Sequence, residues 1–272
     1  TRIGFDHTDL LGTRLFKIAV EKCGIIKPGA PVLTTSQDDE ASRVIREISA
    51  YAGAPLTVLP SSARVEFAKD RTVFAFSPGV GQNAPVRLRA FGRHQAENAA
   101  LALSAAREFL SRGGRPTTAR AISRMIRAVE NTLIAGRFEI LRRSSPPAVF
   151  DVAHNGEAAR ALAVALDDFA RVRRTPAIRF SAVVALYRDK DAAAFARGLT
   201  STKRIRDATV VVPPDESAHA FHARDLVSAF ARAGVRARYF PDAARAVGDT
   251  RRRPVVLTGS FRLAPLAYAR TR

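Results

Sequence analysis

The stretch AVFDVAHNGEAARALAVALDDFARVRRTPAIRFSAVVAL, residues 148–186, decides the fold. It opens with a short apolar run at 148–151, continues with helical spacing of apolar residues over 157–172 and ends in the strongly apolar run 178–186. A buried strand, a helix and a second buried strand make a βαβ unit, whose two strands are parallel. The stretch therefore predicts an α/β domain with a parallel sheet.

The same alternation extends in both directions from this unit. Expected strands are residues 138–141, 208–212, 236–239 and 255–257, and a further helix covers 224–233. The alternation starts afresh at Ala135-Gly136-Arg137, so we place a domain boundary there. The sequence thus predicts two domains, residues 1–135 and 136–272.

The first domain is expected to be α/β as well, with one region of another kind. Its predicted strands are residues 2–5, 31–34 and 56–59, and its predicted helices are 13–24, 38–51, 94–110 and 117–129. Residues 64–91 instead hold short alternating runs separated by glycine and proline, which predicts a small antiparallel patch.

Composition excludes several classes of protein. With 47% apolar and 25% charged residues the chain is globular, and the single Cys23 cannot form an internal disulfide. No apolar run is long enough to span a bilayer, and the sequence from Thr1 onward does not have the basic and apolar pattern of a signal peptide. We therefore expect a cytoplasmic monomer without a membrane partner. The missing initiator Met suggests that upstream sequence has been cut away.

The net charge of +19 raises the question of a nucleic-acid partner. The arginines are spread along the chain, however, and only residues 251–253 form a short run. Aromatic residues are few, with no Trp and four Tyr, whereas single-strand binding surfaces need aromatic side chains on which bases stack. We therefore expect no nucleic acid as partner, and an anionic small substrate would be attracted by the same field.

Two polar segments follow predicted strands, where ligands bind in open α/β sheets. His7 lies in the first, Asp6-His7-Thr8-Asp9, for which a metal site and a turn-capping role are both open. The second runs from Asp151 through His154 to Gly156 and would fix a ribose or phosphate group, or else cap the following helix. His219 and His222 have no third ligand nearby and are expected to be exposed, and no phosphate-binding loop motif occurs.

Several blocks of sequence resemble one family. DHTDLLG at 6–12 and IAVEKCGIIKPG at 18–29 look like the DHTDxLG and IAxEKAGIxKPG blocks of folylpolyglutamate synthase and bifunctional dihydrofolate synthase, members of the Mur ligase superfamily. Further blocks follow in order to the end of the chain: GRHQAENAA at 92–100, GRFE at 136–139, FDVAHN at 150–155, DKD at 189–191 and TGSF at 258–261.

The resemblance implies a fold and a reaction. The fold would be the C-terminal part of a P-loop-type central domain followed by a Rossmann-like α/β C-terminal domain. These enzymes use ATP and Mg²⁺ to phosphorylate a carboxyl group, and the amine of L-glutamate then attacks the acyl phosphate. Dihydropteroate or the glutamate tail of a reduced folate is the acceptor, and a monovalent cation is an open possibility.

The resemblance also implies roles for residues. His7 matches a magnesium ligand, and Lys22 matches a lysine that the family carries as a carbamate able to hold Mg²⁺. For Lys22 the ordinary alternative is a solvated helix face or an ion pair.

Five further residues match positions around the nucleotide and the second substrate. Asn98 matches an adenine contact and Arg137 a phosphate contact at the hinge, while Asp151 and His154 match contacts to ribose and phosphate. Lys190 would meet glutamate or the acyl phosphate, with a loop ion pair as the alternative.

The sequence also departs from the family pattern. Cys23, Ala135 and Gly156 stand where Ala, Pro and Pro are usual, and the family's phosphate-binding loop has no counterpart in these 272 residues. These residues alone are therefore expected not to catalyse ligation. Two alternatives remain beside a folate ligase: another Mur-family amide ligase, and a non-catalytic basic remnant or binding module.

Overall fold

The computed structural model describes residues 2–5, 12, 14–60, 65–79, 82–115, 117–142, 146–212 and 223–269. They form two compact units. Of the residues just given, the first unit contains those up to Leu133 except Ala90–Gly92, and the second contains Ala90–Gly92 and those from Ile134 onward. His7, His219 and His222 lie outside the described residues.

A six-stranded sheet forms the centre of the second unit, in the order β10-β9-β8-β11-β7-β6. The strands are β6 (Glu139–Arg142), β7 (Ala148–Asp151), β8 (Phe180–Val184), β9 (Ile205–Val210), β10 (Ala237–Tyr239) and β11 (Val255–Thr258). All neighbours pair in parallel except β6, which is antiparallel to β7. Every residue of β7, β8 and β11 is buried, as expected for parallel strands covered on both faces. The predicted α/β fold is confirmed.

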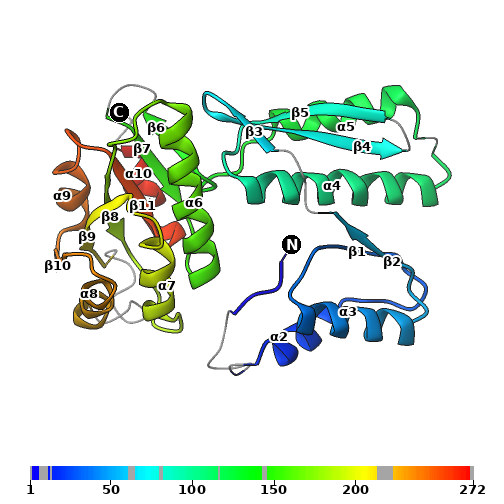
Figure 1. Cartoon of the computed structure of the whole chain (residues 1–272), viewed down its shortest axis with the longest axis horizontal. Helices are drawn as coiled ribbons and strands as arrows, with labels where there is room; N and C mark the ends of the chain where they lie inside the picture. The colour runs from blue at the N-terminus through cyan, green and yellow to red at the C-terminus, as the bar shows by residue number, and fades with distance from the viewer. Residues whose placement is uncertain are drawn as a thin grey trace. The chain divides into compact units, whose positions relative to one another are not determined.

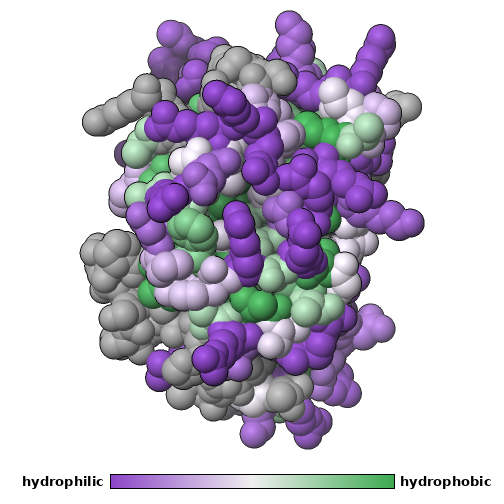
Figure 2. Space-filling view, turned by 90° about the vertical axis from the view of Figure 1, so that its left-hand side faces the viewer, coloured by the Kyte–Doolittle hydropathy of each residue, from purple (hydrophilic) through white to green (hydrophobic). Residues whose placement is uncertain are grey.

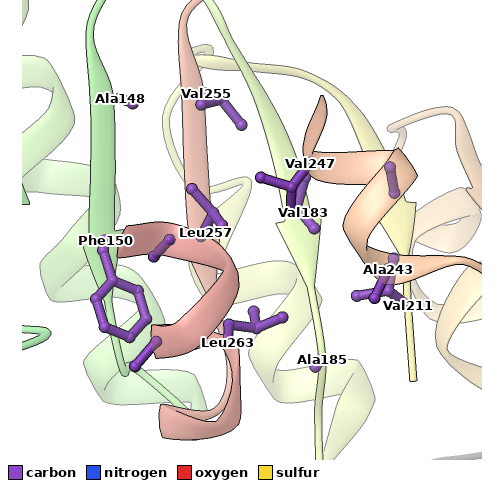
Figure 3. Packing of buried hydrophobic residues seen from close by; sticks show 13 residues of the cluster. Ala148, Phe150, Val183, Ala185, Val211, Ala243, Val247, Val255, Leu257 and Leu263 are labelled. Carbon is purple, nitrogen blue, oxygen red and sulfur yellow. The ribbon is translucent and has the colours of Figure 1, made fainter. Parts of the chain in front are cut away.

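Helices cover both faces of this sheet (Figure 1). They are α6 (Gly156–Val172), α7 (Ala192–Leu199), α8 (Ala223–Arg232), α9 (Ala243–Gly248), the 3₁₀ turn η2 (Phe261–Leu263) and α10 (Ala264–Ala269). On the face of α9 and α10, Phe150, Val183 and Leu257 pack against Leu263 and Val247 (Figure 3). The helices α6 and α7 lie on the opposite face (Figure 1).

The first unit contains two small sheets. One pairs β1 (Val32–Thr35) with β2 (Leu56–Leu59) in parallel, beside α2 (Leu15–Cys23) and α3 (Asp39–Tyr51). The other is an antiparallel meander of β3 (Val65–Ala68), β4 (Arg71–Gly79) and β5 (Gln82–Leu88), as predicted for this region. Two helices, α4 (Arg93–Arg112) and α5 (Ala119–Asn131), share a core with the meander.

The predicted strand at residues 2–5 is wrong. Arg2–Phe5 forms no strand, and the backbone N–H of Ile3 donates to Oε1 of Gln37 at 2.7 Å. A side chain thus takes the donor that a sheet ladder would have used.

Two surface properties bear on possible partners. Among the described residues, no helix is long and apolar enough to cross a membrane. Hydrophilic residues are spread among apolar ones over the face in Figure 2, which agrees with the scattered arginines of the sequence.

Candidate functional site

The carboxyl edge of the six-stranded sheet contains a topological switch point. Strands β7 and β11 are parallel neighbours, yet β7 leads into α6 on one face and β11 into η2 and α10 on the other (Figure 1). The two connections diverge at these strand ends, and in open α/β sheets ligands bind at such a place.

The loops at this edge are fixed to one another. The hydroxyl of Thr258 donates to the carbonyl oxygen of Ala153 at 3.3 Å, and the N–H of Ala185 donates to the carbonyl oxygen of Thr258 at 3.1 Å. Gly259 has a φ of +102°, and a Cβ there would overlap the carbonyl oxygen of Ala185. Only glycine allows this approach, so the loops after β7, β8 and β11 hold one arrangement.

Asp151 ends β7 and anchors the segment before β6. Its side chain is buried, with Oδ2 accepting the N–H of Phe138 and Oδ1 the N–H of Ala153, each at 2.8 Å. Burial raises the pKa of this carboxyl to about 6, against the opposing effect of the two amides and of the nearby Arg137 and His154. Asp151 therefore holds the backbone at Phe138 and Ala153 in place, in addition to any contact that it makes with a ligand.

The backbone around Arg137 is held in an unusual conformation. Gly136 and Phe138 have φ values of +66° and +45°. The carbonyl oxygen of Gly136 accepts the N–H of Val152 at 2.9 Å. The Phe138 ring is fully buried, with its centroid 5.0 Å from that of Phe91. The Arg137 side chain between these anchored neighbours is exposed.

A second carboxylate supports the same segment from the other side. Oε2 of Glu139 accepts the N–H of Gly136 at 3.1 Å and the hydroxyl of Tyr268 at 2.9 Å. Partial burial and the Glu139 carboxylate raise the pKa of Tyr268. Sequence reasoning missed Tyr268, since no motif or spacing connects two residues 129 positions apart.

The loop after β7 contains the predicted His154 and a helix cap. Nδ1 of His154 lies 3.0 Å from the carbonyl oxygen of Val152, so Nδ1 carries the proton in that bond because a carbonyl only accepts. Oδ1 of Asn155 accepts the N–H of Ala158 at 2.9 Å and caps α6. The capping alternative is thus confirmed for Asn155, and His154 sits one residue before the cap.

Lys190 lies in the loop after β8, at the same edge of the sheet. Its side chain is only 9% exposed, and Nζ is 3.2 Å from Oδ2 of Asp189. The loop ion pair considered from the sequence is therefore present. The next residue, Asp191, caps α7 by accepting the N–H of Ala194 at 2.8 Å.

Lys22 and Asn98 belong to the first unit. Lys22 is exposed in the last turn of α2, and Asn98 is exposed on α4, whose Ala96 and Ala99 are buried in the core. The described residues contain no group of three or more His, Cys, Asp or Glu side chains able to hold a metal ion.

Comparison with known proteins finds a family model that matches the region containing this edge. Residues 136–260 match the family model described as "Mur ligase, glutamate ligase domain". Over these residues the chain is similar to the glutamate ligase domains of Mur ligases. Arg137, Asp151, His154 and Lys190 lie inside this region, whereas Lys22 and Asn98 precede it.

Curated relatives extend the similarity beyond the glutamate ligase domain. The chain is 31% identical over 194 residues to a dihydrofolate synthase/folylpolyglutamate synthase of Bacillus subtilis (strain 168), covering 70% of this chain and 43% of the relative. It is also 31% identical over 178 residues to the mitochondrial folylpolyglutamate synthase of Homo sapiens, covering 58% of this chain and 28% of the relative. The chain thus spans less than half the length of these two relatives, and the resemblance to this family is confirmed.

Solved structures agree over nearly the whole chain. Mycobacterium tuberculosis folylpolyglutamate synthase, complexed with ADP and AMPPCP, matches with a TM-score of 0.78 at 26% identity over 99% of this chain and 62% of its own. E. coli FolC, in complex with ADP, matches with a TM-score of 0.73 at 26% identity, and the match covers 98% of this chain and 59% of FolC. Residues 136–260 and the unit before them therefore share a fold with enzymes solved with bound nucleotides.

Proposed function

We propose that this chain is part of an ATP-dependent ligase that joins L-glutamate to dihydropteroate or to the glutamate tail of a reduced folate. The observation that carries the proposal is the glutamate ligase domain at residues 136–260, with Arg137, Asp151 and His154 gathered at its switch point. The relatives named above are folate ligases, which favours this reading over a sister Mur ligase. The protein would be a cytoplasmic monomer whose partners are small-molecule substrates. It would bind neither nucleic acid nor a membrane.

Within the second unit we assign the nucleotide to the carboxyl end of β7. The exposed guanidinium of Arg137 can give two parallel hydrogen bonds to phosphate oxygens. His154, held through Nδ1, presents its other ring nitrogen to ribose or phosphate. The N-terminus of α6 directly behind His154 adds the positive end of a helix dipole, which favours an anion.

The first unit would supply the adenine contact and the metal ligands. Asn98 is exposed on α4 and would donate to and accept from the adenine edge. The Lys22 side chain is exposed, so carbon dioxide can reach Nζ, and the oxygens of the resulting carbamate are hard donors of the kind that Mg²⁺ prefers. Together with His7, Lys22 would hold Mg²⁺, which when bound neutralises phosphate charge.

Lys190 is proposed to bind the second substrate. Its nearly buried ammonium at the carboxyl edge of the sheet would attract the carboxylate of glutamate or the acyl phosphate. The ion pair with Asp189 would then hold the ammonium in place until an anion arrives.

Phosphate release by the complete product of the gene tests the proposal. ATP, Mg²⁺ and L-glutamate are supplied with either dihydropteroate or tetrahydrofolate, beside Lys22→Ala and a control, Lys17→Ala, which changes another exposed lysine of α2. We expect release with at least one acceptor, lost in Lys22→Ala and kept in Lys17→Ala. Release with neither acceptor would overturn the proposed reaction, while equal activity of both variants would remove Lys22 from the site.

A further inference from the structure

Two carboxylates secure the backbone on either side of Arg137. Asp151 holds the amide of Phe138, and Glu139 holds the amide of Gly136. Both amides belong to residues with positive φ, a conformation that is costly for Phe138 and persists only where the surroundings impose it. The exposed side chain of Arg137 therefore projects from a segment whose neighbours are both fixed.

The Glu139 bond is itself supported from the last helix of the described chain. The Tyr268 hydroxyl donates to the same Oε2 that accepts the Gly136 amide. The Tyr268 ring meets the fully buried Phe150 ring edge to face, with centroids 6.1 Å apart. Phe150 also limits Gly136, because a Cβ on Gly136 would lie 3.2 Å from the Phe150 ring.

These contacts involve segments that the ligand proposal does not use. Tyr268 lies in α10, after the matched ligase domain ends at residue 260, and Glu139 begins the antiparallel edge strand β6. A surface tyrosine that served only the core would need no carboxylate partner. Here its hydroxyl reaches an oxygen already committed to the residue before Arg137.

We propose that Glu139 and Tyr268 are positioning residues that orient Arg137 toward the nucleotide phosphates. The inference rests on the proposed function, because it takes Arg137 as the phosphate contact. Glu139 fixes the Gly136 amide and Tyr268 fixes Glu139, so the direction of the guanidinium depends on a residue in α10.

The test compares Tyr268→Phe, Glu139→Ala and Glu139→Gln in the complete gene product, with Tyr239→Phe as control on exposed β10. A glutamine amide oxygen can accept both hydrogen bonds, so Glu139→Gln should restore what Glu139→Ala loses. The readouts are the KM for ATP and kcat, the affinity for AMPPCP, and hydrogen exchange of the Gly136 amide.

We expect Tyr268→Phe to weaken AMPPCP binding about fivefold, the equivalent of one net hydrogen bond, and to speed exchange at Gly136. In an Arg137→Ala background Tyr268→Phe should change the affinity no further, because the group that it orients is gone. A loss that is the same with and without Arg137 would show a merely structural role and overturn the inference.

The Arg137→Ala variant distinguishes failure of the proposed phosphate contact from failure of the proposed positioning by Glu139 and Tyr268. If it leaves AMPPCP affinity and turnover unchanged, the proposed phosphate contact falls and the positioning inference falls with it. If Arg137→Ala is impaired while Tyr268→Phe and Glu139→Ala match Tyr239→Phe, the proposed function stands and the inference alone is wrong.

Discussion

Oδ2 of Asp151 accepts the backbone N–H of Phe138 at 2.8 Å, although the two residues are 13 positions apart and the whole of β6 lies between them. The bond ties the start of the matched region 136–260 to the end of β7, next to the loop that carries His154. A buried carboxylate in this place makes the fold of the domain sensitive to pH.

The first prediction concerns that pH dependence. Burial raises the pKa of Asp151 to about 6, so the folded state holds the proton more tightly than the unfolded chain does. The contribution of Asp151 to the free energy of unfolding should be fully present below pH 4 and fall by about 3 kcal/mol as the pH rises to 7. The side chain in Asp151→Asn does not titrate, so the variant should not show this decrease in the free energy of unfolding.

Urea unfolding of both proteins between pH 4 and 7 measures the difference directly. The two proteins have every other titratable group in common. The free energy of unfolding of the wild type minus that of Asp151→Asn therefore gives the pH dependence that comes from the Asp151 carboxyl alone. The difference should decline with a midpoint between pH 4 and 6. A difference that stays constant over this range would contradict the raised pKa.

A second prediction separates backbone strain from steric overlap at Gly136. Its φ of +66° is nearly the same as the +67° of Gly114, but an added Cβ meets Val152 Cγ1 at 2.6 Å at Gly136 and nothing within 4 Å at Gly114. Gly114→Ala should cost about 1–2 kcal/mol, the usual penalty for a left-handed residue. Gly136→Ala should cost a further 1–3 kcal/mol or so. Equal losses in thermal unfolding would mean that Val152 moves aside freely.

The third prediction concerns the crossing of α6 and α7. A Cβ on Gly198 would overlap the carbonyl oxygen of Gly156, so the two helices approach at a pair of glycines. Gly198→Ala should destabilise the second unit by about 1–3 kcal/mol through overpacking. Gly248→Ala in α9, where nothing lies within 4 Å, should lose nothing and is the matched control for denaturant unfolding.

The core of the second unit was predictable because its strands have a signal of their own. Continuous apolar runs mark β7, β8 and β11, and parallel strands buried on both faces require such runs. The same kind of signal was misleading at residues 2–5, which form no strand and where the N–H of Ile3 donates to the side chain of Gln37. Strand pairing is a tertiary property that four residues cannot specify.

The candidate site was predictable only where motifs carried it. Arg137, Asp151, His154 and Lys190 stand in recognisable blocks, and the structure places the last three at the carboxyl edge of the sheet or in loops that leave it. The partnership of Glu139 with Tyr268 could not be anticipated, because it depends on how α10 returns to β6 after 129 residues. The sequence also does not show that both carboxylate oxygens of Asp151 accept hydrogen bonds from backbone amides.

The fourth prediction tests the cap of α6. Oδ1 of Asn155 accepts the N–H of Ala158, so Asn155→Ala should cost about 1 kcal/mol, whereas Asn155→Asp keeps an accepting oxygen and should stay close to wild type. Thermal unfolding measures both. A matching loss in the two variants would indicate that the amide nitrogen of Asn155, rather than its oxygen, supports the loop beside His154.

The last prediction concerns what the fork of Arg137 contributes beyond its charge. A guanidinium gives two parallel hydrogen bonds to a phosphate, whereas an ammonium acts as a single point charge. Arg137→Lys should therefore lower kcat/KM for ATP about tenfold and Arg137→Ala about a hundredfold, since charged hydrogen bonds are worth about 1.5–3 kcal/mol each. Arg197→Lys, at an exposed position in α7, should leave kcat/KM unchanged.

A second readout for these variants needs no turnover. The positive charge of Arg137 lowers the pKa of Asp151, so Arg137→Ala should move the midpoint of the pH-dependent unfolding upward while Arg137→Lys preserves it. Loss of activity in Arg137→Lys with an unmoved midpoint would assign the defect to the missing fork. A midpoint that moves in Arg137→Lys as far as in Arg137→Ala would instead show that the ammonium no longer lies beside Asp151.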